Sequence, residues 1–255
     1  MIYIFDGSYT GFLCCIFEAF EMKEWNAVPT PEKQHQPNMF VPERTIFSDV
    51  DKADRIQKAL AEKFGTRTSS DFYRAFLSED VEAFKAVFYI AIALFKGQTN
   101  ILQNFGDAVV LYYHQTLKKV SRERHRMKAF IRFSKTNDGL FYAVIEPDFN
   151  VLPLILKFFK DRYADQLWMI YDVKRKYGFY YDKHQISEVT LDASEQQELN
   201  NSALSIALDE RDELFQNLWK RYFKSTNIEA RKNMKLHLQH VPKRYWKYLV
   251  ETQMW

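Results

Sequence analysis

The chain has 255 residues, of which 47% are hydrophobic and 16% aromatic, and only seven are glycine. This composition indicates a globular rather than a disordered protein, and the length suffices for one large domain or two small ones. A formal net charge of +3 is too small to indicate nucleic-acid binding by itself.

The first half of the chain predicts a strand, a turn and a helix, followed by a loop, a second short strand and several more helices. Residues 2–5 are apolar and lead into Asp6-Gly7-Ser8, after which apolar side chains recur at helical spacing as far as Phe20. Four prolines between residues 29 and 42 predict an exposed loop, followed by a short strand at 44–47. Helical spacing and polar N-caps then predict helices at 49–64, from Ser69 or Ser70, at 81–95 and at 105–124.

In the second half the pattern changes to strands. Two β-rich runs are joined by Asn137-Asp138-Gly139, a common hairpin turn. A helix follows, for which Asp148 or Asn150 is the predicted cap, and then two tyrosine-rich strands. The predicted elements are strands at 127–134, 140–146, 166–173 and 177–183, with a helix at 151–163.

This ββαββ order predicts an α+β fold with a mostly antiparallel sheet and helices on one face. We expect a single domain over residues 1–255. Its sheet-containing core is predicted at 1–192, and a helical, basic and aromatic extension that packs on this core is predicted at 193–255.

A basic cluster where the long helix is expected to meet the first of these strands is the main candidate site. The members expected to hold phosphate are Arg122, Arg124, His125, Arg126 and Lys128. Arginine offers a planar pair of donors to phosphate oxygens, and histidine adds a donor or carries a proton. The same residues would also suit the solvated end of a helix, where cations interact favourably with the helix dipole.

Charge is strongly segregated in the last part of the chain. Residues 182–213 contain nine acids against two basic residues, whereas residues 214–248 contain nine basic residues against one acid. The basic part is interleaved with aromatic residues, which suits cations on phosphates and rings stacked on bases. A pair of amphipathic helices with aromatic residues in the core would give the same pattern. The residues expected to extend the phosphate contact are Lys235, Lys243, Arg244 and Tyr245.

Two carboxylates after the second predicted strand are weaker candidates, for catalysis. Glu146 and Asp148 flank a proline, and paired carboxylates can bind a metal or divide acid and base roles, with His125 as a further proton carrier. A helix cap and a salt bridge to one of the arginines explain the two carboxylates equally well.

The remaining motifs favour structure over chemistry. Asp6-Gly7-Ser8 opens a helix and is only a weak anion site, and the adjacent Cys14 and Cys15 are expected to be buried. His237 and His240 lack a third ligand nearby, so no metal site is predicted. The chain has no phosphate-binding glycine loop, dinucleotide fingerprint, serine nucleophile elbow or cysteine-rich pattern, and we predict no cofactor.

Five segments carry a resemblance to a known family. They are YIFDGSYTGFLCCIFEAF (3–20), RERHRMKAFIRF (122–133), LFYAVIEPDFNVLP (140–153), QLWMIYDVKRKYGFYYD (166–182) and PKRYWKYL (242–249). Together they resemble a bacterial family of unknown biochemistry described as a "probable DNA metabolism protein". Members of that family resemble one another over nearly their full length, so the resemblance would cover most of this chain.

The resemblance implies partners rather than a reaction. Members are typically encoded beside a DNA modification or repair protein of the radical-SAM class, and a similar domain occurs fused to a uracil-DNA-glycosylase-like domain. The family supplies no catalytic residues, and Phe149 stands here where many members have a histidine after Glu-Pro-Asp.

We therefore expect a DNA-binding accessory protein in repair or modification that acts with a radical-SAM partner. Two alternatives stay open: an enzyme acting on a nucleotide or modified base through Glu146, Asp148 and His125, and a protein-interaction module that docks its acidic stretch 182–213 on a basic partner. The two adjacent cysteines, an N-terminal apolar run too short for a signal peptide and no run of membrane-spanning length predict a cytoplasmic protein.

Overall fold

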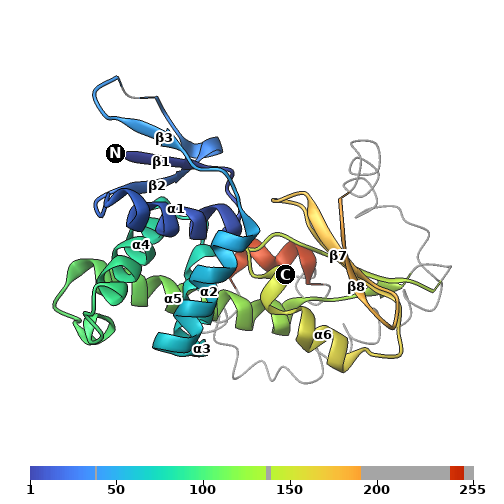
Figure 1. Cartoon of the computed structure of the whole chain (residues 1–255). Coiled ribbons are helices and arrows are strands. Elements are labelled where there is room, and N and C mark those ends of the chain that lie inside the picture. The colour runs from blue at the N-terminus through green and yellow to red at the C-terminus, as the bar shows by residue number, and fades with distance from the viewer. Residues whose placement is uncertain (38, 136–138, 191–241, 250–255) are drawn as a thin grey trace. The chain divides into compact units, whose positions relative to one another are not determined.

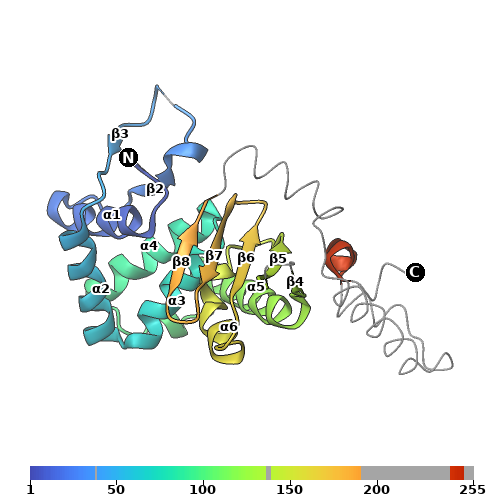
Figure 2. The same cartoon turned by 90° about the vertical axis from the view of Figure 1, so that its right-hand side faces the viewer.

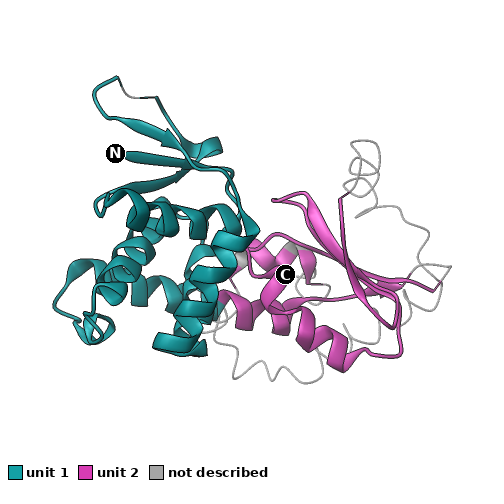
Figure 3. Cartoon of the chain, viewed as in Figure 1, with its two compact units in different colours: residues 1–122 teal, residues 123–255 magenta. Residues whose placement is uncertain are grey.

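A computed structural model describes residues 1–37, 39–135, 139–190 and 242–249 (Figure 1). The chain divides into two units, Met1–Arg122 and Glu123–Trp255, and the division falls within one long helix, α5 (Figure 3). The sequence predicts one domain whose helical extension begins at 193. Most of that extension lies outside the described residues, so its helices remain a prediction.

In Met1–Arg122, three strands form a small parallel sheet in the order β2-β1-β3. The central strand β1 (Ile2–Phe5) pairs in parallel with both β2 (Val28–Pro31) and β3 (Glu43–Thr45). The sequence prediction of a loop is therefore wrong for the first part of the proline-rich segment. Pro29 and Pro31 are two residues apart on an edge strand, so both can direct the side that lacks an N–H away from β1.

Polar caps set the starts of three helices in this unit, as the sequence predicts. α1 (Tyr9–Met22) begins at Ser8, whose hydroxyl accepts a backbone N–H of the first turn at 2.9 Å. α2 (Val50–Phe64) begins at Asp49 and α4 (Val81–Phe95) at Asp80, and each aspartate accepts a first-turn N–H at 3.1 Å. Such caps satisfy backbone donors that have no partner within the helix.

α3 (Thr66–Phe76) starts earlier than the sequence predicts. The chain turns at Gly65, which ends α2 and has a φ of 91°, a conformation that glycine adopts without strain. Ser69 and Ser70, the predicted caps, lie inside the helix, where the Ser70 hydroxyl donates to the Thr66 carbonyl at 2.9 Å.

Aromatic rings fill the core of this unit. Phe5, Phe12, Phe76 and Phe84 come from β1, α1, α3 and α4, and the ring centres of the pairs in contact lie between 5.1 and 6.0 Å apart. Two short 3-10 turns, η1 (Glu32–Gln34) and η2 (Ile101–Gln103), complete the unit. Among the helices in the described ranges, none combines the length and apolar character needed to cross a membrane.

The second unit contains a five-stranded sheet in the order β4-β5-β6-β7-β8, whose strands lie side by side in Figure 2. These strands are β4 (Ser134–Lys135), β5 (Phe141–Ile145), β6 (Trp168–Asp172), β7 (Tyr177–Tyr181) and β8 (Ile186–Val189). The predicted ββαββ order is present, and β8 is an additional strand that the sequence pattern did not reveal.

The α+β class is confirmed, but the prediction of a mostly antiparallel sheet is wrong, because the five-stranded sheet is mixed and the three-stranded sheet is parallel. β5 and β6 pair in parallel, whereas the other neighbours in the five-stranded sheet are antiparallel, and the first unit adds a fully parallel sheet. Between β5 and β6 the chain passes through η3 (Leu152–Leu154) and α6 (Leu156–Arg162). Such a helical crossover returns the next strand in the same direction.

α6 packs against the sheet through Phe159, whose ring centre lies 6.4 Å from that of the buried Trp168. No side chain caps the start of α6 or of η3, so the predicted capping roles of Asp148 and Asn150 are wrong. Asn150 instead accepts a hydrogen bond from the Tyr177 hydroxyl.

α5 (Ala108–Phe130) extends six residues beyond its predicted end at Arg124. The predicted strand at 127–134 is therefore wrong, and within that range only Ser134, the first residue of β4, pairs with another strand. Val120, Glu123 and Met127 are buried at intervals of three and four residues, the period of a helix packed on one side. Consequently Arg124 and Arg126 lie within a helix and not at a junction between helix and strand.

Candidate nucleic-acid interface

The exposed face of α5 carries a row of basic side chains. Lys118, Arg122 and His125 are exposed and are spaced by four and three residues, so they follow one line along the helix. Further basic residues flank this row, namely Lys119, Arg124 and Lys128. Within the described ranges, no ion pair joins any of these six residues to a carboxylate.

Lys128 is partly covered, since its ammonium lies 4.9 Å from the ring centre of Phe158. Such a contact buries the aliphatic stem of a lysine while its charge stays at the surface. The ammonium of Lys128 therefore adds to the basic residues at the end of α5.

On the opposite face of the same helix, Glu123 is 1% exposed, which makes it one of the few buried charged residues in the described chain. Its Oε1 accepts hydrogen bonds from the backbone N–H of Asp148, at 2.9 Å, and from the hydroxyl of Tyr245. Tyr245 lies in the 3-10 helix η5 (Lys243–Tyr248) and is itself 1% exposed. A buried carboxylate is tolerated where its oxygens find donors in this way.

Two arginines complete the surroundings of Glu123. Arg244 approaches Oε2 of Glu123 at 3.4 Å and Oδ2 of Asp148 at 2.6 Å, through its Nη2 atom. Arg126 approaches the same Glu123 oxygen at 3.8 Å. Two cations thus face two carboxylates, and this group adds little to the positive field of the surface.

The segment that carries Asp148 is held from a second side by the turn after β6. Arg175 donates to the carbonyls of Pro147 and Asp148, each at 3.1 Å, and Lys174 also reaches the Asp148 carbonyl at 3.1 Å. Arg175 is anchored by Asp172, which is fully buried and lies 2.8 Å from it. Burial raises the pKa of Asp172, although hydrogen bonds from Arg175 and from two backbone N–H groups oppose this effect.

The structure places most of the predicted phosphate-binding residues in two groups, those whose side chains contact Glu123 and those that lie along α5 with no ion pair to it within the described ranges. Arg126, Arg244 and Tyr245 meet at Glu123, although Arg244 and Glu123 are 121 residues apart in the sequence. Lys243 lies in η5, and Lys235 lies outside the described residues. Arg122, Arg124, His125 and Lys128 stay on α5.

Two of the three predicted catalytic candidates, Glu146 and Asp148, have structural partners. Oε2 of Glu146 accepts the Tyr248 hydroxyl at 2.9 Å, and Asp148 is ion-paired with Arg244. His125 is exposed on α5. Among the residues that the structure describes, no group of three or more histidine, cysteine, aspartate or glutamate side chains could hold a metal ion.

The turn at Asp6-Gly7-Ser8 has a carboxylate in the position where an anion would bind. Oδ1 of Asp6 accepts the Ser8 N–H at 2.9 Å, and Oδ2 accepts the Ser48 hydroxyl at 2.7 Å. Partial burial opposes ionisation of Asp6, but the hydrogen bonds from Ser48 and Ser8 prevail and lower its pKa. Asp6 therefore binds the N–H and the hydroxyl of Ser8, the residue that caps α1, and places a negative charge in this turn.

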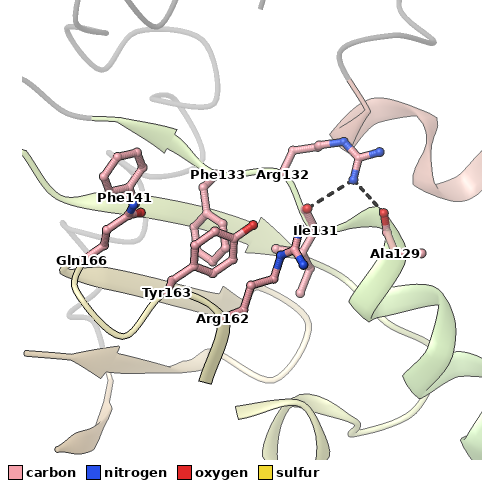
Figure 4. A pocket seen from close by; sticks show the side chains of 8 residues that line it. All are labelled: Ala129, Ile131, Arg132, Phe133, Phe141, Arg162, Tyr163 and Gln166. Atoms are coloured by element: carbon pink, nitrogen blue, oxygen red, sulfur yellow. Dashed lines mark hydrogen bonds between the residues drawn. The ribbon is translucent and has the colours of Figure 1, made fainter. Parts of the chain in front are cut away.

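A pocket in the second unit was not apparent from the sequence. It has a volume of about 540 Å³ and lies where α5, β5 and α6 approach one another (Figure 4). Its lining residues are Ala129, Ile131, Arg132, Phe133, Phe141, Arg162, Tyr163 and Gln166. The Arg132-Phe133 and Arg162-Tyr163 pairs are the only local signal, and nothing in the sequence indicates that they share a cavity.

The Tyr245–Glu123 contact predicts a specific loss of stability at alkaline pH. Burial and the hydrogen bond to Glu123 raise the pKa of Tyr245 above its ordinary value of 10.0. The folded state therefore favours the protonated phenol. Its stabilising effect is complete below pH 10 and is lost as the pH rises further, because the unfolded chain then gives up this proton first.

Urea unfolding of the wild type and of Tyr245→Phe between pH 9 and 11.5 would measure this effect. The wild type should lose stability more steeply above pH 10, by at most about 1.4 kcal/mol per pH unit. Between pH 6 and 8 the two slopes should agree, because both side chains are neutral there. Equal slopes of stability against pH for the two proteins above pH 10 would contradict the inference that the contact with Glu123 keeps the Tyr245 hydroxyl protonated.

Comparison with known families gives one match. The model of a family described as a domain of unknown function, DUF4130, matches residues 81–251, about two thirds of the chain. The match includes the whole of α5, the five-stranded sheet and η5. No curated protein and no solved structure matches the chain.

Proposed function

Because the chain belongs to the DUF4130 family, whose biochemistry is unknown, we propose a function from its surface chemistry: it binds DNA through the exposed basic face of α5. In this proposal the protein is an accessory in DNA repair or modification. The observation that supports it is the row of Lys118, Arg122 and His125, flanked by further cations and without carboxylate partners in the described ranges.

The contacts around Glu123 limit which residues take part. Arg126 and Arg244 face Glu123 and Asp148, so a phosphate would have to compete with carboxylates for them. The side chains free of such competition are better placed to hold a DNA backbone, since phosphate contacts position a protein without reading sequence. They are Lys118, Lys119, Arg122, Arg124, His125 and Lys128.

Binding through this face should depend steeply on salt. If about five phosphates are neutralised by the lysines and arginines, the logarithmic slope is about −4.5, and affinity should fall roughly 500-fold between 50 and 200 mM salt. The double variant Arg122→Ala with Arg124→Ala removes two of these contacts. We expect a weaker affinity and a slope shallower by about 1.8. Fluorescence anisotropy with labelled single- and double-stranded oligonucleotides measures both.

The matched control is Lys58→Ala with Lys63→Ala, which removes two exposed cations from α2. It changes the net charge equally but leaves α5 intact, so the salt slope should stay as in the wild type. A flat salt titration of the wild type, or equal effects of the two double variants, would overturn the proposal for this face.

The partner belongs to the same proposal. The family resemblance implies a radical-SAM protein that modifies or repairs DNA. In this proposal the chain binds the DNA, and the partner catalyses the reaction. Co-expression of the two proteins should give a complex that survives gel filtration and binds DNA more tightly than either protein alone. If the two chains elute separately and the DNA affinity is unchanged, the proposed complex with the radical-SAM partner is wrong.

A further inference from the structure

We propose that the pocket between the end of α5, the start of β5 and the end of α6 binds one nucleotide, as a base together with its phosphate. This site is distinct from the row of cations on α5, and binding there does not depend on the proposed function. The cavity of about 540 Å³ lies within the range of roughly 300–1,000 Å³ that is typical of small-molecule sites.

The two ends of the pocket differ in chemistry. In the view of Figure 4, Arg132 and Arg162 lie toward one end, Phe141 and Gln166 lie toward the other, and the rings of Phe133 and Tyr163 lie between them. No acidic residue is among the described side chains that line the cavity. A ligand that matches this order has a planar, hydrogen-bonding body and an anionic group at one end.

The aromatic rings are held in place by the core behind them. Tyr163 lies parallel to Phe159, with ring centres 6.2 Å apart, and it meets Phe133 edge-on at 5.4 Å. Phe159 is buried and also contacts Trp168. Rings fixed in this way lose little conformational entropy when a base stacks on them.

Arg162 is the side chain best placed to pair with a phosphate. It is exposed at the end of α6, and its guanidinium carbon lies 5.8 Å from the Tyr163 ring centre. Its planar fork of donors matches phosphate oxygens. Arg132 is oriented by donating to the carbonyls of Ala129, at 2.7 Å, and Ile131, at 3.3 Å, which keeps its positive charge beside the same cavity.

Gln166 supplies the polar group expected near the base. It precedes β6, and its side-chain amide offers both donors and an acceptor to the edge of a base. A nucleotide can come from two sources, a free nucleoside monophosphate or a nucleotide exposed in a single DNA strand. Both present the same base and phosphate, so an experiment has to separate them.

Calorimetric titration of the full chain with deoxynucleoside 5′-monophosphates tests the site. We expect binding that weakens at least tenfold for the nucleoside, which lacks phosphate, and for deoxyribose 5-phosphate, which lacks a base. Arg162→Ala should reduce nucleotide affinity about tenfold and leave nucleoside affinity unchanged. Gln166→Ala should weaken the nucleotide and the nucleoside alike. Lys157→Ala, which removes an exposed cation from the same helix, is the matched control and should have no effect.

Competition separates the two sources. If short single strands displace the monophosphate, the strand supplies the ligand, and if they do not, the free nucleotide is the ligand; either result supports the site. No binding of the monophosphates at millimolar concentration, or equal effects of Arg162→Ala and Lys157→Ala, would overturn the proposal. Failure here is distinct from failure of DNA binding by α5, because Arg122→Ala with Arg124→Ala should retain nucleotide binding.

Discussion

Glu123→Ala should lower the free energy of unfolding by about 2–6 kcal/mol, because two buried donors would be left without an acceptor. The Tyr245 hydroxyl and the Asp148 N–H would lose their acceptor inside the protein. Each unsatisfied buried donor accounts for about 1–3 kcal/mol. Arg126 and Arg244 contribute less, because their side chains are 19% and 41% exposed and water can replace the carboxylate.

Urea unfolding at pH 7, followed by tryptophan fluorescence, measures this loss as a lower midpoint at an unchanged slope. Glu123→Gln keeps an acceptor for both donors and should lose less than alanine does. Glu62→Ala is the surface control, because Glu62 is 65% exposed and its carboxylate lies as far as 3.9 Å from the Lys58 ammonium in an i,i+4 pair. This variant should change the free energy of unfolding by no more than about 0.5 kcal/mol. Similar losses in the free energy of unfolding for Glu123→Ala and Glu62→Ala would contradict a stabilising role for the buried hydrogen bonds to Glu123.

Asp172→Ala should have an effect of similar size, about 3–5 kcal/mol, in the turn between β6 and β7. Asp172 is fully buried and accepts the backbone N–H groups of Lys174 (3.0 Å) and Arg175 (3.2 Å) as well as the Arg175 side chain (2.8 Å). The Arg175 side chain is only 9% exposed. Removing the carboxylate would leave a cation with little access to water, and Arg175 would no longer be fixed for its bonds to Pro147 and Asp148.

Asp182 provides a matched control because it makes the same local contacts without deep burial. It accepts the N–H groups two and three residues further on, those of His184 (2.8 Å) and Gln185 (2.7 Å), and these bonds lower its pKa. Asp182→Ala loses the two backbone bonds but no buried ion pair, so its urea midpoint should fall much less. Equal shifts for the two variants would show that the turn contacts, and not the buried pair with Arg175, determine stability at Asp172.

Local patterns in the sequence were sufficient for much of the secondary structure. Ser8, Asp49 and Asp80 begin helices because a short polar side chain can satisfy the first backbone N–H groups of the same segment. The strands β5, β6 and β7 fall within their predicted ranges. The prediction failed at 127–134, where short-range β preference is overridden by the packing of Met127 against the core as part of a helix.

The starts of α1, α2 and α4, the α+β class and the basic character of α5 follow from the sequence alone, because each depends on residues within a few positions of one another. Only the tertiary structure decided that Glu123 is buried, that Arg244 and Tyr245 reach it across 121 and 122 residues, and that two Arg-aromatic pairs share a pocket. Contacts of this range leave no periodic trace in the chain. The neighbouring sequence of a buried charged residue does not differ from that of an exposed one. Its hydrogen-bond partners are determined by how the helix and the sheet pack together.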